Sequence, residues 1–177
     1  MKYGDNRISY IRIIALVCIL SLLFSCLPSC TEPSVEDESP LSFEFDSSLD
    51  AYRVVGIGEF AEKDLTIPSK HNKKSVLVIG SFAFWGCKEL WSVKIEEGIE
   101  LIENDAFSDC YHITKIFLPR SLKLISDYAF NSCTSLLSFY FAGTREEWTA
   151  IEKGEGWDTG TPNYTIYCSD GNVYKKK

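Results

Sequence analysis

Apolar residues recur in the middle of the chain with a fixed spacing of 23 residues. An Ala-Phe-x-x-Cys block begins at Ala83, and again at Ala106 and Ala129. An isoleucine stands four positions before each of these alanines, and other apolar positions keep the same phase. A period between about 20 and 29 residues that is rich in Leu and Ile predicts a solenoid of leucine-rich repeats.

Each repeat has the pattern of a short strand followed by turns. Leu90, Val93 and Ile95 end in an apolar–polar alternation, which is typical of a strand with one buried face. A turn, a second apolar segment and a short helical turn through the Ala-Phe-x-x-Cys block complete the unit. One unit is too small to bury its apolar residues, so we expect the units to stack, each phenylalanine on the next. The predicted fold class is an α/β repeat, a solenoid of short stacked strands and short helical turns.

The segment before the repeats has the pattern of a β-hairpin. Leu41, Phe43 and Phe45 alternate with polar residues, a turn signal follows, and residues 52–56 alternate again. A solenoid needs a cover over its terminal repeat, so this hairpin is predicted to be an N-terminal cap. The insertion at residues 70–74 lengthens the first repeat and is predicted to be a solvated loop.

The segment after the repeats has the pattern of a helix followed by a strand. Thr144 is placed to be the N-cap of the helix and Glu147 stands at its third position, which together form a capping box. Trp148 follows and is expected to cover the last repeat. A strand is expected at residues 164–168, after a glycine-rich loop. We therefore predict a C-terminal helix–strand cap over residues 142–174.

These motifs resemble the BspA-like leucine-rich repeats of bacterial surface proteins. The resemblance is carried by Leu65–Pro68, by Val76–Gly80 and by the three Ala-Phe-x-x-Cys blocks, and it covers about residues 41–170. The chain departs from the family pattern at three turn positions, Glu96, Glu103 and Ser126. We place one leucine-rich-repeat domain over residues 41–174, with its core repeats at about residues 65–141.

The N-terminus has the pattern of an export signal. Three basic residues precede an apolar run, Ile13–Phe24, which is too short to span a membrane comfortably. Ser25 and Cys26 follow at once and resemble the lipobox of bacterial lipoproteins, in which the cysteine is acylated and becomes the first residue of the mature chain. We expect residues 1–25 to be the signal peptide and Cys26 to be the lipid attachment site. An ordinary signal peptide with an incidental cysteine, or acylation at Cys30, are the alternatives.

A flexible tether is predicted for residues 26–40, which combine prolines, serines and acidic residues without apolar periodicity. In the lipoproteins that this region resembles, an aspartate after the acylated cysteine favours the inner membrane. Leu27 occupies that position, so the resemblance implies an outer-membrane location. The acidic run Glu36–Glu38 is similar to a surface-export signal of some Gram-negative anaerobes. The side of the membrane that the protein faces is left open.

The composition excludes a disordered chain and a general nucleic-acid binder. The 177 residues are 45% hydrophobic and 24% charged, which is ordinary for a globular protein. The formal net charge is −7, and removal of residues 1–25, which hold three basic residues and one acidic residue, changes it to −9. Such a surface repels nucleic acid and other anionic partners. The expected contacts are a membrane, through the N-terminal lipid, and a protein or glycan ligand.

Patterns for catalysis and metal binding do not occur in the sequence. Cys87, Cys110 and Cys133 occupy one repeat position, so their side chains run parallel into the core, which suits packing rather than disulfide bonds. Zinc motifs of closely spaced Cys and His are absent, as are phosphate-binding and dinucleotide-binding loops. A nucleophile–base pair of Cys110 with His112 is disfavoured, because the cysteine is expected inside and the histidine outside. We predict no enzyme activity and no cofactor, and leave the remaining cysteine pairings and the oligomeric state open.

The residues between the buried positions of each strand are expected to face solvent in two columns. The two columns contain Trp91, Thr114 and Leu137, and Lys94, Phe117 and Tyr140. Exposed aromatic groups with polar surroundings are typical of binding hot spots. The candidate binding face consists of Trp91, Lys94, Phe117, Leu137 and Tyr140. A cap that covers these columns, or aromatic residues chosen for strand propensity alone, are the alternatives.

The sequence as a whole predicts a lipid-anchored, non-enzymatic binding module. A solenoid offers an extended binding surface, and no catalytic set accompanies it. We therefore expect adhesion to a protein or glycan at the cell surface. An envelope scaffold, or an accessory subunit of a partner enzyme, is the alternative.

Overall fold

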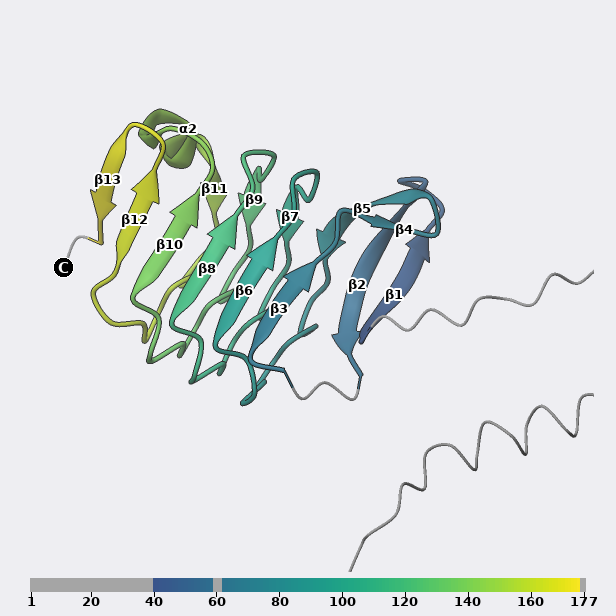
Figure 1. The fold of residues 1–177 in the computed structure, drawn as a ribbon, viewed down its shortest axis with the longest axis horizontal. Coiled ribbons are helices and arrows are strands. Elements are labelled where there is room, and N and C mark those ends of the chain that lie inside the picture. Colours follow the sequence, from purple (N-terminus) through teal and green to yellow (C-terminus); the bar gives the residue numbers. More distant parts are fainter. Residues whose placement is uncertain (1–39, 59–61, 176–177) are drawn as a thin grey trace, which may run out of the picture. The chain divides into compact units, whose positions relative to one another are not determined.

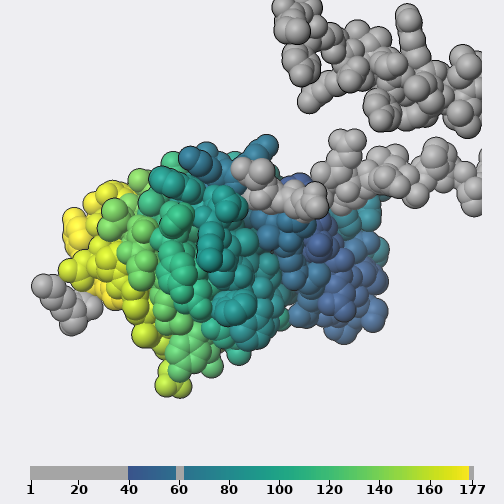
Figure 2. Space-filling model, turned by 90° about the horizontal axis from the view of Figure 1, so that it is seen from below, coloured from purple at the N-terminus to yellow at the C-terminus, as the bar shows by residue number. Residues whose placement is uncertain are grey.

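A computed structural model describes residues 40–58 and 62–175 of the chain. The expected signal peptide and Cys26 lie outside these residues. The described residues form a β-solenoid of about five turns with little helix (Figure 1). Successive coils follow one another as adjacent bands from the first strands to the last (Figure 2).

Two sheets form the long sides of the solenoid. The seven-stranded sheet, here called sheet A, has the order β1-β2-β5-β7-β9-β11, and β4 pairs with β5. Its strands are β1 Leu41–Asp46, β2 Ala51–Ile57, β4 Lys70–His71, β5 Lys74–Ile79, β7 Leu101–Ile102, β9 Leu124–Ile125 and β11 Glu152–Lys153. The six-stranded sheet, here called sheet B, has the order β13-β12-β10-β8-β6-β3. Its strands are β3 Asp64–Ile67, β6 Ser92–Ile95, β8 Lys115–Leu118, β10 Ser138–Phe141, β12 Thr165–Cys168 and β13 Gly171–Tyr174.

Apolar side chains at equivalent repeat positions fill the space between the sheets. Val93, Ile116 and Phe139 are fully buried and lie in register on β6, β8 and β10. The residues that follow them in each strand point outward, because successive side chains of a strand alternate between its two faces. The repeat in the sequence therefore becomes a stack of like residues along the core.

The phenylalanine of each Ala-Phe-x-x-Cys block stacks on the next, as the repeat predicts. The ring centroids of Phe84 and Phe107 lie 4.9 Å apart, and those of Phe107 and Phe130 lie 5.3 Å apart. Both ring pairs are within 6° of parallel, and all three side chains are buried. Trp157 meets Phe130 edge-on at 6.2 Å and ends the series.

The helical turns expected through these blocks do not form. The backbone N–H groups of Asp105, Phe107 and Asp109 instead donate to carbonyl oxygens of the next coil. The N–H groups of Ala106, Ser108 and Cys110 donate to carbonyl oxygens three residues earlier and so close tight turns. The Cys110 N–H, for example, donates to the Phe107 carbonyl at 3.3 Å. An α-helix would use all these N–H groups within the segment. The third side of the solenoid is thus a run of turns, and the fold is a β-solenoid rather than an α/β repeat.

The first two strands of sheet A form an antiparallel hairpin, and β2 continues in parallel with β5. The residues expected to be a solvated loop, 70–74, instead form a second hairpin between β4 and β5. His71 of this hairpin stacks on Phe43 at 4.0 Å and meets Tyr52 edge-on at 4.6 Å. His71 therefore ties the insertion to the aromatic side chains of the first hairpin, while Lys70, Asn72 and Lys73 stay exposed to solvent.

One helix, α2 Arg145–Ala150, occurs within the described residues. Thr144 is its N-cap, and both hydrogen bonds of the capping box with Glu147 are present. Trp148 of this helix is buried against Phe139 and Phe141, with ring centroids 6.1 and 5.6 Å away. Over the same residues, no helix is long and apolar enough to cross a membrane.

Candidate functional site

The outer face of sheet B carries three residues of the predicted binding face, Lys94, Phe117 and Tyr140. The strand register places Lys94 of β6 beside Phe117 of β8, and Phe117 beside Tyr140 of β10. The same register extends to β12, where Tyr167 lies beside Tyr140. The inward residues of these strands belong to the core, so the fold itself holds the outward residues in one row.

Three of these side chains form a continuous aromatic ladder. The ring centroids of Phe117 and Tyr140 lie 4.8 Å apart, and those of Tyr140 and Tyr167 lie 4.9 Å apart. The interplanar angles are 18° and 12°, so the rings stack face to face. The side chains are 36%, 38% and 40% exposed in the order Phe117, Tyr140, Tyr167. No cap segment within residues 40–58 and 62–175 covers them, so the ladder is an accessible apolar surface.

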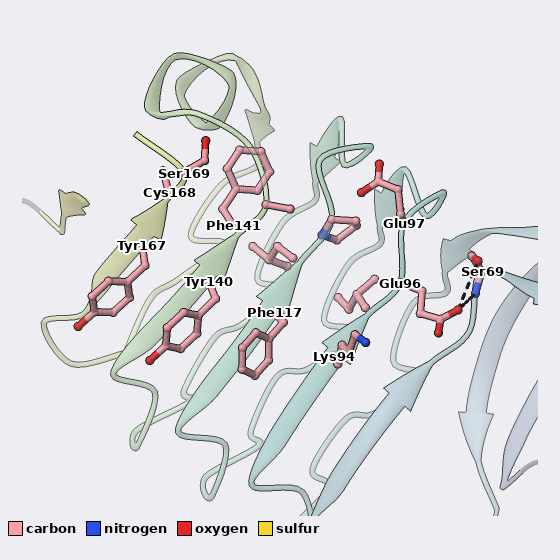
Figure 3. A pocket seen from close by; sticks show the side chains of 14 residues that line it. Ser69, Lys94, Glu96, Glu97, Phe117, Tyr140, Phe141, Tyr167, Cys168 and Ser169 are labelled. Atoms are coloured by element: carbon pink, nitrogen blue, oxygen red, sulfur yellow. Dashed lines mark hydrogen bonds between the residues drawn. The ribbon is translucent and has the colours of Figure 1, made fainter. Parts of the chain in front are cut away.

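A groove of about 840 Å³ runs beside the ladder, across the carboxyl ends of the strands (Figure 3). Lys94 and the ladder line one side, and the residues that follow each strand line the other. Two glutamates lie at the β6 end of the groove. Glu96 accepts from the backbone N–H of Ser69 at 3.0 Å, and Glu97 accepts from the backbone N–H of Arg120 at 2.9 Å. The groove thus has a charged end near β6 and an aromatic end near β12.

Three polar groups in this groove have no partner within residues 40–58 and 62–175. They are the Lys94 ammonium and the hydroxyl groups of Tyr140 and Tyr167. An ammonium and two phenols can all donate hydrogen bonds, and the phenols can also accept them. The ladder stacks its rings against one another, so it offers a ligand ring edges and hydroxyl groups rather than open ring faces.

The other predicted column lies at the amino ends of the strands. Trp91 is 45% exposed, with the Lys63 ammonium 4.8 Å from its ring centroid and the His112 ring 5.9 Å away. Leu137 is 56% exposed. Thr114 joins the two, because its N–H donates to the Trp91 carbonyl and its carbonyl accepts from the Leu137 N–H. Neither Trp91 nor Leu137 lines the groove, so the five predicted residues divide between the groove and this separate column.

The 23-residue period does not predict Tyr167 as a binding residue, although Tyr167 extends the ladder by one ring. Tyr167 follows Tyr140 by 27 residues instead of 23, because α2 and the glycine-rich loop lie between them. The 164–168 strand was nevertheless expected. Alignment of its buried Ile166 with the buried Phe139 would have placed Tyr167 beside Tyr140, as the register does.

The cysteines of the repeats are packing groups in the core. The thiol of Cys110 donates to the Phe84 carbonyl at 3.0 Å, and that of Cys133 donates to the Phe107 carbonyl at 3.1 Å. Burial raises the pKa of Cys133 to about 12 and raises that of Cys110 as well, so both thiols stay protonated. His112 lies outside against Trp91, which separates it from the buried Cys110 thiol. No group of metal-ligating side chains occurs among the described residues.

The family model for the BspA type leucine-rich repeat region matches residues 55–153 of the chain, in six copies. No curated protein sequence matches the chain.

Several solved structures share the fold. A leucine-rich repeat protein from Bacteroides capillosus is 21% identical, with a TM-score of 0.60 over 73% of this chain and 94% of that one. The T. pallidum leucine-rich repeat protein is 20% identical, with a TM-score of 0.58 over 68% of this chain and 64% of that one. The pneumococcal vaccine antigen PcpA is 20% identical, with a TM-score of 0.54 over 65% of this chain and 27% of that one. The match thus spans under two thirds of the T. pallidum protein and about a quarter of the pneumococcal antigen.

Proposed function

The chain belongs to the BspA-type leucine-rich repeat proteins, and we propose that it is a lipid-anchored, non-enzymatic adhesion module of the cell surface. Its ligand is a protein or a glycan, held on the outer face of sheet B. Membership of a family of repeat proteins supports a binding role, because stacked repeats present extended surfaces. Likeness to a pneumococcal vaccine antigen supports a surface location.

The observation that carries this proposal is the exposed ladder of Phe117, Tyr140 and Tyr167 beside the groove. Aromatic rings at the centre of a patch are the commonest hot spots of protein interfaces. The ladder is also rigid, since each ring is held by its neighbour and by the strand beneath it. A rigid surface loses little conformational entropy when it binds, so its contact area converts efficiently into affinity.

The ends of the solenoid bound this face. The β1–β2 hairpin acts as the N-terminal cap, and α2 with β12 and β13 acts as the C-terminal cap. The burial of Trp148 against the last core residues supports the second assignment. Exposed ends would compete with the ligand face for apolar partners, so the caps confine binding to the side of the solenoid.

We expect single replacement of Phe117, Tyr140 or Trp91 by Ser to reduce ligand capture at least about tenfold, the usual effect at an interface hot spot. Stability should change little, because these side chains face solvent. The measurement is capture of extracellular-matrix proteins and purified glycans by residues 31–177, with a melting curve for each variant. Phe45→Ser is the matched control, since Phe45 is 41% exposed on β1. Strong destabilisation by all three replacements would assign these residues to the core and remove the proposed face.

The anchor gives a second prediction. Hydrolysis of the Ser25–Cys26 peptide bond removes residues 1–25, and the lipid on Cys26 places the protein in the detergent phase of a membrane extract. Cys26→Ala should release the protein or leave it unprocessed, and Cys30→Ala should leave it anchored. The mass of the mature N-terminal peptide checks both variants. An unmodified N-terminus at another residue would overturn the lipoprotein assignment, and protection from protease on intact cells would overturn the surface location.

A further inference from the structure

Four large aromatic side chains stand on the turn segments that connect sheet A back to sheet B. They are Phe82, Trp85, Tyr111 and Tyr128, which are 58%, 59%, 41% and 39% exposed. Within the described residues none of these rings stacks on another ring, in contrast to the ladder on sheet B. Phe82 and Trp85, which are more than half exposed, therefore present ring faces to a ligand, whereas the Tyr128 ring packs against Gly156 and presents less of its surface.

One carboxylate positions two of these rings. Asp109 accepts a hydrogen bond from the indole N–H of Trp85 at 3.2 Å and another from the Tyr111 hydroxyl at 3.0 Å. The contact with Trp85 joins successive coils, whereas the contact with Tyr111 lies within one repeat. The bond to Asp109 raises the pKa of Tyr111, so the phenol keeps the proton that it donates. Both rings are thus oriented before any ligand arrives, although they are exposed.

A second carboxylate lies between the other two rings. Phe82, Asp105 and Tyr128 occupy one repeat position in three successive coils, and adjacent coils are about 4.8 Å apart. Within residues 40–58 and 62–175 neither Asp105 nor Asp109 contacts a lysine or arginine. The turn segments therefore hold two uncompensated negative charges among four aromatic rings.

The backbone conformation at Phe82 indicates that the fold does not require a phenylalanine at this position. Its φ is 59°, in the left-handed region, which is unfavourable for a bulky side chain. Asp105 and Tyr128 take up the same conformation in the next two coils, with φ 54° and 55°, and aspartate tolerates it better than an aromatic residue does. An exposed phenylalanine at this position thus adds strain and apolar surface without adding to the core. Such a combination is expected where a residue serves binding.

We propose that these six residues, here called the turn face, dock a basic polypeptide segment of a partner protein. Its lysine or arginine side chains lie against the aromatic rings beside Asp105 and Asp109. Cations bind to the faces of Trp, Tyr and Phe rings, and the guanidinium of arginine also stacks on them. The net charge of −7 draws a basic partner towards the chain. The turn face is separate from sheet B, so the protein has two docking surfaces of different chemistry.

The test uses a fluorescent nine-residue peptide of alternating Arg and Gly, titrated with the full-length chain in detergent micelles. Asp109→Asn removes the charge but keeps an acceptor oxygen near Trp85 and Tyr111. We expect Asp109→Asn and Trp85→Ala each to weaken binding about threefold to fivefold, the range of an exposed cation–π contact. Glu152→Gln is the matched control, because it removes one exposed charge from β11, and it should leave the affinity unchanged. The indole N–H resonance of Trp85 should shift on addition of the peptide, and melting curves should show that each variant is folded.

Equal weakening by Asp109→Asn and Glu152→Gln would overturn the turn face, because only the net charge would then matter. Equal binding of a peptide with Glu in place of Arg would contradict the proposal that the partner segment is basic. If the chain associates with itself and Asp109→Asn abolishes that association, the turn face binds a second copy of the chain, and the proposed basic partner is wrong. Tyr140→Ser separates this inference from the sheet B proposal, since it should leave the Arg–Gly peptide bound. Loss of the peptide with Tyr140→Ser would move the site to sheet B.

Discussion

Replacement of Phe107 by Ala is expected to lower the free energy of unfolding by about 3–5 kcal/mol, the usual loss for a buried phenylalanine. Phe107 is fully buried and stacks on Phe84 on one side and on Phe130 on the other. The remaining cavity cannot collapse easily, because the coils are tied together above and below it by backbone hydrogen bonds. A domain of this size is stabilised by only about 5–15 kcal/mol, so the melting temperature should fall by roughly 10 °C or more.

Phe82→Ala is the matched control for Phe107→Ala. Its side chain is 58% exposed, and truncation of an exposed side chain usually changes stability by less than about 0.5 kcal/mol. Chemical denaturation of both variants measures the difference. A Phe107→Ala protein that unfolds at the wild-type midpoint would contradict the role of the phenylalanine stack as the centre of the core.

Replacement of Trp148 by Ala is expected to lower the free energy of unfolding by a similar amount, about 3–5 kcal/mol. The loss of stability should, however, be concentrated at the C-terminal end of the solenoid. Trp148 is 4% exposed and meets the rings of Phe139, Phe141 and Trp157. It belongs to the last coil, and terminal repeats of a solenoid can open without the rest. We therefore expect faster amide hydrogen exchange in β10 and β12, while β6 keeps its protection.

Trp148→Phe is the conservative partner of this experiment, because it keeps a ring against Phe139 and should recover much of the lost stability. Hydrogen exchange of the two variants, followed strand by strand, gives the comparison. Uniform acceleration in every strand of Trp148→Ala would contradict the assignment of α2 as a cap, since the loss would then belong to the whole solenoid.

The 23-residue period predicted the solenoid because each repeat must bury like residues against like residues. The same argument placed Phe84, Phe107 and Phe130 in one stack, and it put Lys94, Phe117 and Tyr140 in one row on the outer face. Both follow from the strand register alone, in which every residue lies beside its equivalent in the next coil. Such neighbours do not depend on details of the turns.

The turn conformation could not be predicted in the same way. The spacing of Ala106, Phe107 and Cys110 fits one turn of a helix, and the sequence does not reveal where a backbone N–H donates. In the solenoid the Phe107 N–H finds a carbonyl of the next coil at 2.8 Å, so no helical bond forms. The choice is made by the neighbouring coil, which is a tertiary contact rather than a local preference.

Two further differences arose from insertions that break the period. Residues 70–74 were expected in solvent because no equivalent exists in the other repeats. They pack through His71 on Phe43 and Tyr52, which lie about 20 to 30 residues earlier. Tyr167 was overlooked because the segment before it is longer than a repeat. In both cases the contacting residues are not separated by the 23-residue period, so the period cannot predict that they meet.

The proposal that sheet B holds the ligand is tested most directly by crosslinking on intact cells. A photo-reactive phenylalanine analogue at position 140 lies in the ladder, whereas the same analogue at position 45 lies on β1, with similar exposure of the native residue. We predict that ligand is crosslinked from position 140 and not from position 45. Crosslinking from position 45 alone, with none from position 140, would contradict the account.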